Sequence, residues 1–168
     1  MSVSEHKQEA KRSLNIAIIT VSDTRVESTD KSGQKMKQLA EEKGHKVYFY
    51  RIVKDDAGQI ASAIEECCQA DAVDVILLNG GTGISKRDVT VETVNGLLDK
   101  HLPGYGEIFR LLSYQEDIGS AAILSRATAG VAKGKAIFTT PGSTGAVTLA
   151  MNKLILPELA HAVREITK

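Results

Sequence analysis

The sequence predicts an α/β protein with a three-layer αβα sandwich and a mostly parallel central sheet. Short apolar runs of strand length recur along the chain, amphipathic helical patterns separate them, and the connecting loops are short. Strands that alternate with helices pair in parallel, because each helix carries the chain back across one face of the sheet. With 168 residues, 42% of them hydrophobic, the chain is long enough for one such domain with a full core.

The first half of the chain is expected to supply three strands and two helices. The continuous apolar run at 15–21 predicts a strand that is buried on both faces, and further strands are predicted at 47–53 and 74–79. Apolar residues at helical spacing predict one helix at 32–43 and another that begins at Asp56.

The second half is expected to be mostly helical. Helical spacing of apolar residues predicts three segments, at 91–98, 108–112 and 121–129, with Pro103-Gly104 as an interruption between the first two. A last short strand at 136–139 precedes a long amphipathic helix at 147–166, which Pro157 is expected to kink.

Composition excludes several classes of protein. The 21 basic residues balance the 21 acidic ones, and an aromatic content of 4% offers no stacking platform, so we expect no nucleic-acid partner. No apolar run approaches the roughly 20 residues of a membrane span, and the charged start lacks a signal peptide's apolar segment. We therefore expect a cytoplasmic protein with a polar arm at 1–13 and a single domain at 14–168.

A glycine-rich loop directly follows the strand at 74–79. Its bare backbone can approach an anion, and a hydroxyl and two cations stand beside it. These candidate phosphate-binding residues are Gly80, Gly81, Thr82, Gly83, Ser85, Lys86 and Arg87. The loop matches neither a Walker motif nor the dinucleotide fingerprint, and a tight reversal of the chain is the plainer alternative.

Two aspartates stand at the starts of predicted helices. Asp56, with Gln59 three residues later, fits a helix-capping box, and Asp88 could cap the next helix in the same way. The alternative is that both carboxylates lie at the carboxyl edge of the sheet and hold the Mg²⁺ ion that accompanies a nucleotide's phosphates.

Small polar residues follow two other predicted strands and should face the same edge. Ser22 and Asp23 end the first strand, while a second loop precedes the long helix and can hold an anion at its amide groups. That second loop consists of Pro141, Gly142, Ser143 and Thr144. Ser143 is also a natural N-cap, a role compatible with the first.

Several motifs together resemble the MoaB/MogA family of molybdenum cofactor biosynthesis proteins, and more closely its MoaB branch. They are Val21-Ser22-Asp23-Thr24, Asp30-Lys31-Ser32-Gly33, Asp55-Asp56, Gly80-Gly81-Thr82-Gly83, Arg87-Asp88-Val89-Thr90, Pro103-Gly104, Leu124-Ser125-Arg126 and Pro141-Gly142-Ser143. The resemblance covers nearly the whole chain from Asn15 onward.

The resemblance implies an activity and a set of partners. It implies adenylylation of molybdopterin, in which ATP transfers AMP to the pterin's terminal phosphate and pyrophosphate leaves, with Mg²⁺ required. It makes Asp56 and Asp88 the functional acid pair and the residues from Gly80 to Gly83 a phosphate cradle. It also implies assembly as trimers or hexamers, and other molybdenum cofactor synthesis proteins as partners.

Two other readings remain open at this point. The same pocket could serve a non-catalytic molybdopterin carrier or scaffold of the same pathway. A Rossmann-type oxidoreductase is the weakest alternative, because the glycine fingerprint is absent.

Overall fold

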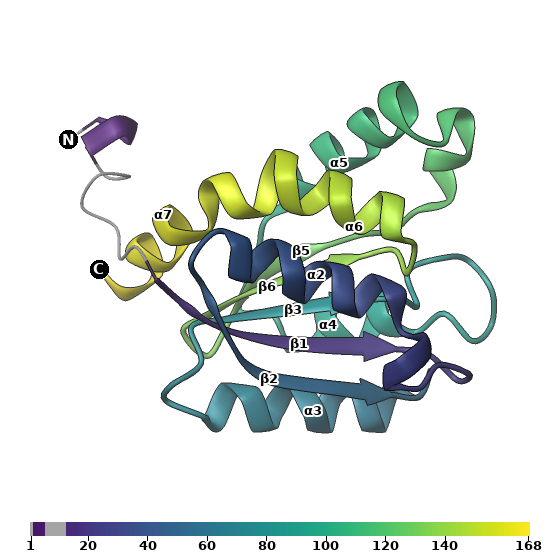
Figure 1. The fold of residues 1–168 in the computed structure, drawn as a ribbon, viewed down its shortest axis with the longest axis horizontal. Coiled ribbons are helices and arrows are strands. Elements are labelled where there is room, and N and C mark those ends of the chain that lie inside the picture. The colour runs from purple at the N-terminus through teal and green to yellow at the C-terminus, as the bar shows by residue number, and fades with distance from the viewer. Residues whose placement is uncertain (1, 6–12) are drawn as a thin grey trace.

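The computed structural model describes residues 2–5 and 13–168, and its centre is a six-stranded sheet in the order β2-β1-β3-β6-β5-β4 (Figure 1). The strands are β1 (Asn15–Val21), β2 (Lys46–Val53), β3 (Val75–Asn79), β4 (Lys100–His101), β5 (Ala129–Ala132) and β6 (Lys135–Thr140). The predicted arm at 1–13 falls mainly on residues 1 and 6–12, which lie outside the described residues.

Four of the strands pair in parallel, as the sequence predicts. β1 pairs with both β2 and β3, and β3 pairs with β6. All residues of β3 and β6 are buried, which accounts for the apolar runs at 75–78 and 136–138 in the sequence. The predicted three-layer α/β sandwich is therefore confirmed.

The prediction of a helix at 121–129 is wrong beyond Leu124. The short 3₁₀ helix η2 (Gly119–Leu124) covers only the first part of this range. The chain then continues into β5, which pairs antiparallel with β6 and β4. Lys133 and Gly134 join β5 to β6 in the left-handed conformation, with φ of 48° and 76°, as a two-residue hairpin does. The alanines near the start of this segment carry helical propensity, but the hairpin and its sheet contacts decide the outcome.

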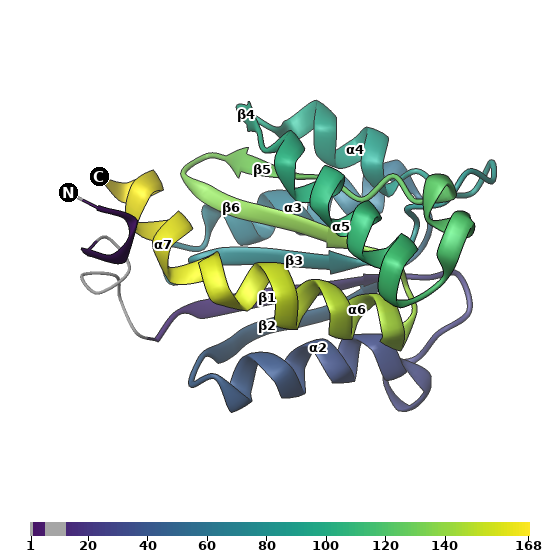
Figure 2. The same cartoon turned by 90° about the horizontal axis from the view of Figure 1, so that it is seen from above.

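Helices cover both faces of the sheet (Figure 2). One face carries α2 (Lys31–Glu42), α5 (Pro103–Glu116), α6 (Thr144–Ala150) and α7 (Leu156–Thr167), and the short 3₁₀ helix η1 (Glu27–Thr29) leads into α2. The other face carries α3 (Ala57–Gln69) and α4 (Thr90–Leu97). Each side has its own buried cluster, which includes Met36 and Phe109 on the first face and Ile60 and Ile64 on the second.

The predicted long helix at 147–166 is present, and its middle is a π-helical turn, η3 (Met151–Ile155), between α6 and α7. Its buried residues recur every four positions, as Val147, Met151, Ile155, Leu159 and Val163. At 3.6 residues per turn, that spacing would rotate the stripe by about 160° over four steps. The wider turn takes up one extra residue and so offsets about 100° of this rotation. Pro157, which cannot donate a backbone hydrogen bond, lies two residues after the turn.

The sheet changes direction of winding between β1 and β3. From β1 the chain moves outward to β2, returns across α3 to β3 on the other side of β1, and continues to β6. Ligands in open α/β sheets bind where the strand order reverses in this way, outside the carboxyl ends of the strands. In the described part of the chain, no helix has both the length and the apolar character that a membrane crossing requires.

Candidate functional site

A cavity of about 410 Å³ lies at the carboxyl edge of the sheet, at the point where the winding reverses. The loops after β1, β2, β3 and β6 form it together with η2. Its lining residues are Val21, Ser22, Arg25, Asp55, Gly80, Gly81, Thr82, Gly83, Asp88, Ile118, Ala121, Leu124, Ser125, Pro141 and Gly142. The predicted convergence of strand-end loops on one crevice is thus present.

The glycine loop needs its glycines for steric reasons. Gly80 and Gly81 adopt φ of 97° and 69°, which L side chains rarely take. A Cβ on Gly80 would lie 2.2 Å from the Val21 carbonyl oxygen, and one on Gly81 would lie 2.2 Å from Thr90 Oγ1. The Thr90 hydroxyl donates to the Gly80 carbonyl over 2.9 Å, so the loop is held against the start of α4.

Asp88 faces the cavity and does not cap α4. Its Oδ2 accepts the Ser85 backbone N–H at 2.9 Å and lies 2.8 Å from the point where a Cβ on Gly83 would stand. The N-cap of α4 is Val89, and no side chain caps it. The carboxylate is therefore placed beside the bare backbone of the loop, where a ligand's phosphates could bind.

The second acid in the cavity lining is Asp55. Its Oδ1 lies 3.2 Å from the point where a Cβ on Gly81 would stand, so it flanks the same loop as Asp88. Burial raises the pKa of Asp55, and the nearby charges of Asp23 and Asp88 raise it further. Two acids that crowd one pocket in this way favour a cation between them.

Asp56, the acid that the sequence pointed to, lies outside the cavity lining. It is the N-cap of α3, where its Oδ1 accepts the Gln59 backbone N–H at 2.9 Å. Gln59 does not close the capping box, because its Oε1 accepts the Lys54 N–H at 3.2 Å. The capping interpretation of Asp56 is confirmed, and its role in metal binding stays a prediction without support from its placement.

The cations next to the glycine loop also lie outside the lining. Arg87 donates to both carboxylate oxygens of Asp23, from Nε at 3.0 Å and from Nη2 at 2.9 Å. The Asp55 backbone N–H, which donates to Asp23 at 3.1 Å, and the Arg87 side chain lower the pKa of Asp23. Asp23 and Arg87 thus form a bridge over the outside of the pocket, and Ser85 and Lys86 are exposed beside it.

The loop after β6 divides between two roles. Pro141 and Gly142 line the cavity, whereas Ser143 caps α6 by accepting the Ala146 N–H at 3.1 Å. Thr144 lines two other hollows, both of which include Lys35 of α2. Of the four residues predicted to hold an anion here, Pro141 and Gly142 lie in the cavity lining, and anion binding by Ser143 and Thr144 stays a prediction.

Arg126 fastens the segment that carries Asp88. Its Nε donates to the Gly83 carbonyl at 2.8 Å and its Nη2 to the Asp88 carbonyl at 3.2 Å. Its Nη1 forms an ion pair with Glu92 of α4. The guanidinium therefore ties both ends of the 83–88 loop to the helix that follows.

Sequence reasoning missed Arg25, Asp55 and the apolar wall of Ile118, Ala121 and Leu124. Asp55 directly precedes Asp56, whose helix-capping pattern drew attention to it. Which of the two carboxylates faces the cavity depends on the path of the chain after β2. Arg25 lies three residues after Ser22, in a loop that the sequence marked as polar, and its backbone N–H donates to Ser22 Oγ at 3.1 Å. A search for cations near each strand end would have found it.

The acids suit a magnesium ion that arrives with a ligand better than a metal caged by the protein. Within residues 2–5 and 13–168, no cluster of three or more His, Cys, Asp or Glu side chains could hold a metal ion. Two carboxylates beside a bare backbone do fit Mg²⁺, which is usually held by one or two carboxylates together with the substrate's phosphates. Asp55 and Asp88 are the residues that would hold it.

Comparison with known proteins gives consistent results along the whole chain. The family described as "Probable molybdopterin binding domain" matches residues 17–161. The chain is 60% identical over 168 residues to Molybdenum cofactor biosynthesis protein B of Bacillus subtilis (strain 168), covering 100% of this chain and 99% of that protein.

Solved structures agree with the sequence comparison. The tungsten cofactor synthesizing protein MoaB from Pyrococcus furiosus is similar with a TM-score of 0.84 and 36% identity, covering 95% of this chain and 100% of that one. A structure of MogA is similar with a TM-score of 0.81 and 30% identity, covering 90% of this chain and 99% of that one.

Proposed function

The chain belongs to the MoaB/MogA family of molybdenum cofactor biosynthesis proteins, and from this membership we propose that it is a Mg-ATP-dependent molybdopterin adenylyltransferase. The observation that carries the proposal is the position of Asp55 and Asp88, whose carboxylates flank one glycine loop inside one cavity. Transfer of a phosphoryl-type group is catalysed mainly by positioning and electrostatic stabilisation, which a bare backbone and metal-holding acids can supply.

The residues present can perform the roles that this reaction requires. The loop from Gly80 to Gly83 brings the backbone close to the phosphates, and Asp55 and Asp88 would hold the Mg²⁺ ion. The bound metal would screen the repulsion between two polyanions and stabilise the leaving pyrophosphate. The terminal phosphate of the pterin is the nucleophile, so no serine, cysteine or histidine has to attack.

Release of pyrophosphate tests the proposal. Pure protein with molybdopterin and Mg-ATP should release pyrophosphate, and Asp55→Asn or Asp88→Asn should lower kcat by about 100-fold or more, as expected when an electrostatic group is removed from the reacting centre. Circular dichroism checks that each variant is folded. Absence of pyrophosphate release by the wild-type protein, under conditions in which a known enzyme is active, would contradict the proposal.

Asp56→Asn separates the two candidate acids. Asparagine caps helices as well as aspartate does, so this variant removes a charge and keeps the cap. We expect turnover close to that of the wild type, as for Asp71→Asn in the exposed turn after α3. A collapse of turnover in Asp56→Asn alone would instead support the acid pair that the sequence suggested.

A non-catalytic carrier is the second candidate, because the apolar wall of Ile118, Ala121 and Leu124 could hold a pterin ring without any chemistry. Calorimetry distinguishes the two. A carrier binds molybdopterin, shows no turnover with ATP, and keeps its pterin affinity in Asp88→Asn.

We also propose that the chain assembles with copies of itself as trimers or hexamers. A surface formed by the end of β4, by α5 and by the segment through η2 exposes apolar side chains that a lone domain would be expected to bury. This α5–η2 surface consists of Leu102, Ile108, Leu111, Tyr114, Ile118, Ile123 and Leu124, which are 40% to 80% exposed.

A further inference from the structure

The cavity at the carboxyl edge has an unbalanced charge. Asp55 and Asp88 both line it, and a phosphorylated ligand would add further negative charge. Arg87, the cation that the sequence suggested, is held by Asp23 on the outside. Among the described residues of the lining, Arg25 alone is basic.

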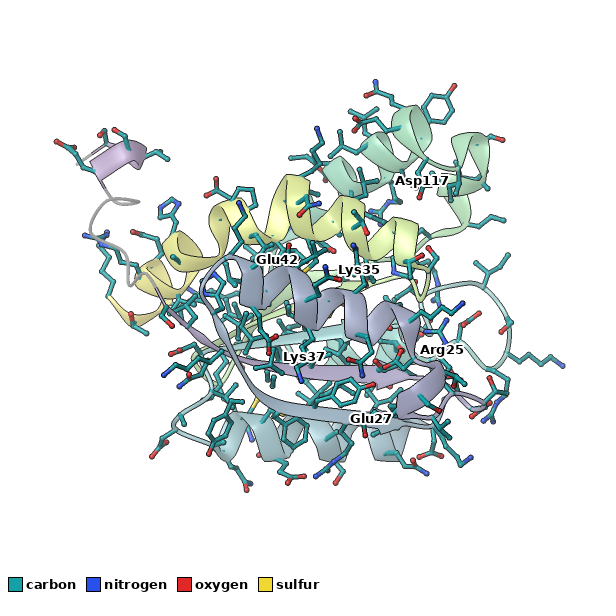
Figure 3. All side chains as sticks on the ribbon, in the orientation of Figure 1. Arg25, Glu27, Lys35, Lys37, Glu42 and Asp117 are labelled. Atoms are coloured by element: carbon teal, nitrogen blue, oxygen red, sulfur yellow. The ribbon has the colours of Figure 1, made fainter. Side chains whose placement is uncertain are left out.

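Arg25 is held firmly and still has donors to offer. Its Nη1 donates to Ser32 Oγ and its Nη2 to the Gly142 carbonyl, both at 2.6 Å. These two bonds use two of the five guanidinium N–H groups. The side chain lines the cavity and is 31% exposed. Figure 3 labels Arg25 at the end of the sheet where the strand arrowheads of Figure 1 lie.

A fully buried carboxylate lies behind Arg25. Asp30 Oδ1 is 3.6 Å from Arg25 Nη1, and the Asp30 side chain has an exposed fraction of 0%. Asp30 accepts from Thr20 Oγ1 at 2.7 Å, from the Gly33 N–H at 3.0 Å and from the Tyr50 hydroxyl at 2.5 Å. A carboxylate removed from water needs a cation and several donors, and Arg25 supplies the cation.

The same network reaches the strand that leads into the glycine loop. Ser32 Oγ donates to Asn79 Oδ1 at 2.7 Å, and Asn79 Nδ2 donates to Thr20 Oγ1 at 2.9 Å. Asn79 is the last residue of β3, directly before Gly80. Arg25, itself in the loop after β1, is thereby connected to the loop after β6 and to the end of β3, which fixes its guanidinium relative to the loop that would hold the phosphates.

We propose that Arg25 binds the phosphate groups of the ligand in this cavity and that buried Asp30 is the positioning residue that fixes its guanidinium. The proposal relies on the proposed function only for the statement that the ligand is phosphorylated. A fork of parallel N–H donors suits phosphate oxygens, and a preorganised arginine loses little freedom when it binds them.

Calorimetry with inorganic pyrophosphate as the probe, at fixed ionic strength and with and without Mg²⁺, tests the role of Arg25. Arg25→Gln should weaken pyrophosphate binding about ten- to a hundredfold, the loss expected for hydrogen bonds to a charged group. Arg25→Lys keeps the charge but not the fork, and should fall between Arg25→Gln and the wild type. The matched control is Arg51→Gln, because Arg51 lies on β2, is 44% exposed and pairs with Glu66. Unchanged affinity in a folded Arg25→Gln protein would overturn the proposal.

A second measurement uses the unaltered protein and does not depend on how a variant folds. Phenylglyoxal modifies accessible arginines, and mass spectrometry locates the adducts. Pyrophosphate should protect Arg25 from modification and leave Arg51 as reactive as before. Equal modification of Arg25 with and without pyrophosphate would overturn the proposal.

The role of Asp30 requires a double-mutant cycle. Asp30→Asn should weaken pyrophosphate binding in the wild-type background and have no further effect in the Arg25→Gln background, because Asp30 acts through Arg25. A purely structural role would weaken binding equally in both backgrounds, and that result would overturn the assignment.

These measurements separate this inference from the proposed function. Pyrophosphate binding that depends on Arg25, in a protein that releases no pyrophosphate from ATP, would support the inference and contradict adenylyl transfer. Turnover and pyrophosphate affinity that are both unchanged in Arg25→Gln would support adenylyl transfer and contradict the inference about Arg25.

Discussion

At the scale of single residues, the site depends on how two adjacent carboxylates diverge. Asp56 turns back to cap α3, while Asp55 points toward the glycine loop. The Asp55 backbone N–H donates to Asp23, whose other partner is Arg87, so this surface ion pair helps to fix the orientation of Asp55. A carboxylate held near two others is poised to accept a cation.

The raised pKa of Asp55 predicts that its charged carboxylate lowers the stability of the folded protein. Its charged form is disfavoured in the folded state, so Asp55→Asn should raise the melting temperature at pH 7. The gain should shrink as the pH falls toward 3.8, the ordinary pKa of aspartate, because the wild-type carboxyl is then neutral as well. Thermal unfolding followed by circular dichroism at several pH values measures this.

The matched control for that experiment is Asp71→Asn, which changes an exposed carboxylate in a turn. A melting temperature for Asp55→Asn that is lower than that of the wild type at pH 7 would show that the carboxylate is not under electrostatic strain.

The sequence predicted those parts of the site whose location follows from the position of the backbone at a strand end. Gly80 to Gly83 and Asp88 follow a strand that is unmistakable in the sequence, so their place at the sheet edge could be foreseen. The directions of Asp55 and Arg25 depend on partners far along the chain, such as Gly142, and local patterns carry no information about those.

At the scale of elements, the loop from Gly83 to Asp88 depends on one clamp. Arg126→Gln removes two hydrogen bonds to loop carbonyls, each worth about 1.5–3 kcal/mol when the donor is charged. We expect faster hydrogen–deuterium exchange in residues 83–88, unchanged exchange in α3, and at least a tenfold loss of kcat/KM. Unchanged exchange in the loop would show that Thr90 and Ser85 are enough to hold it.

The elements that the sequence predicted well are those that tertiary contacts reinforce. β1 and β3 are mostly apolar because helices cover both of their faces. β4 has two residues and β5 has four, and such short strands leave no period to detect. The sequence signal for β5 is the Lys133-Gly134 turn that follows it, and this turn lies beside alanines that equally suit a helix.

At the scale of the whole molecule, the α5–η2 surface predicts self-association. Leu111→Glu together with Ile108→Glu places charges on two side chains that are 52% and 49% exposed, and should shift the protein from trimers or hexamers to monomers in multi-angle light scattering. The matched control is Tyr48→Glu on the edge strand β2, which is 58% exposed. A wild-type protein that is monomeric at micromolar concentration would contradict the prediction.

The π-helical turn at Met151–Ile155 has a consequence for how the gene can change in length. Loss of one codon within α3 would swing everything downstream by about 100° around the helix axis and turn its apolar side toward water. Within the π-helical turn, the same loss converts a wide turn into an ordinary one and leaves the flanking halves in phase. This stretch is therefore where the long helix tolerates a single-residue deletion.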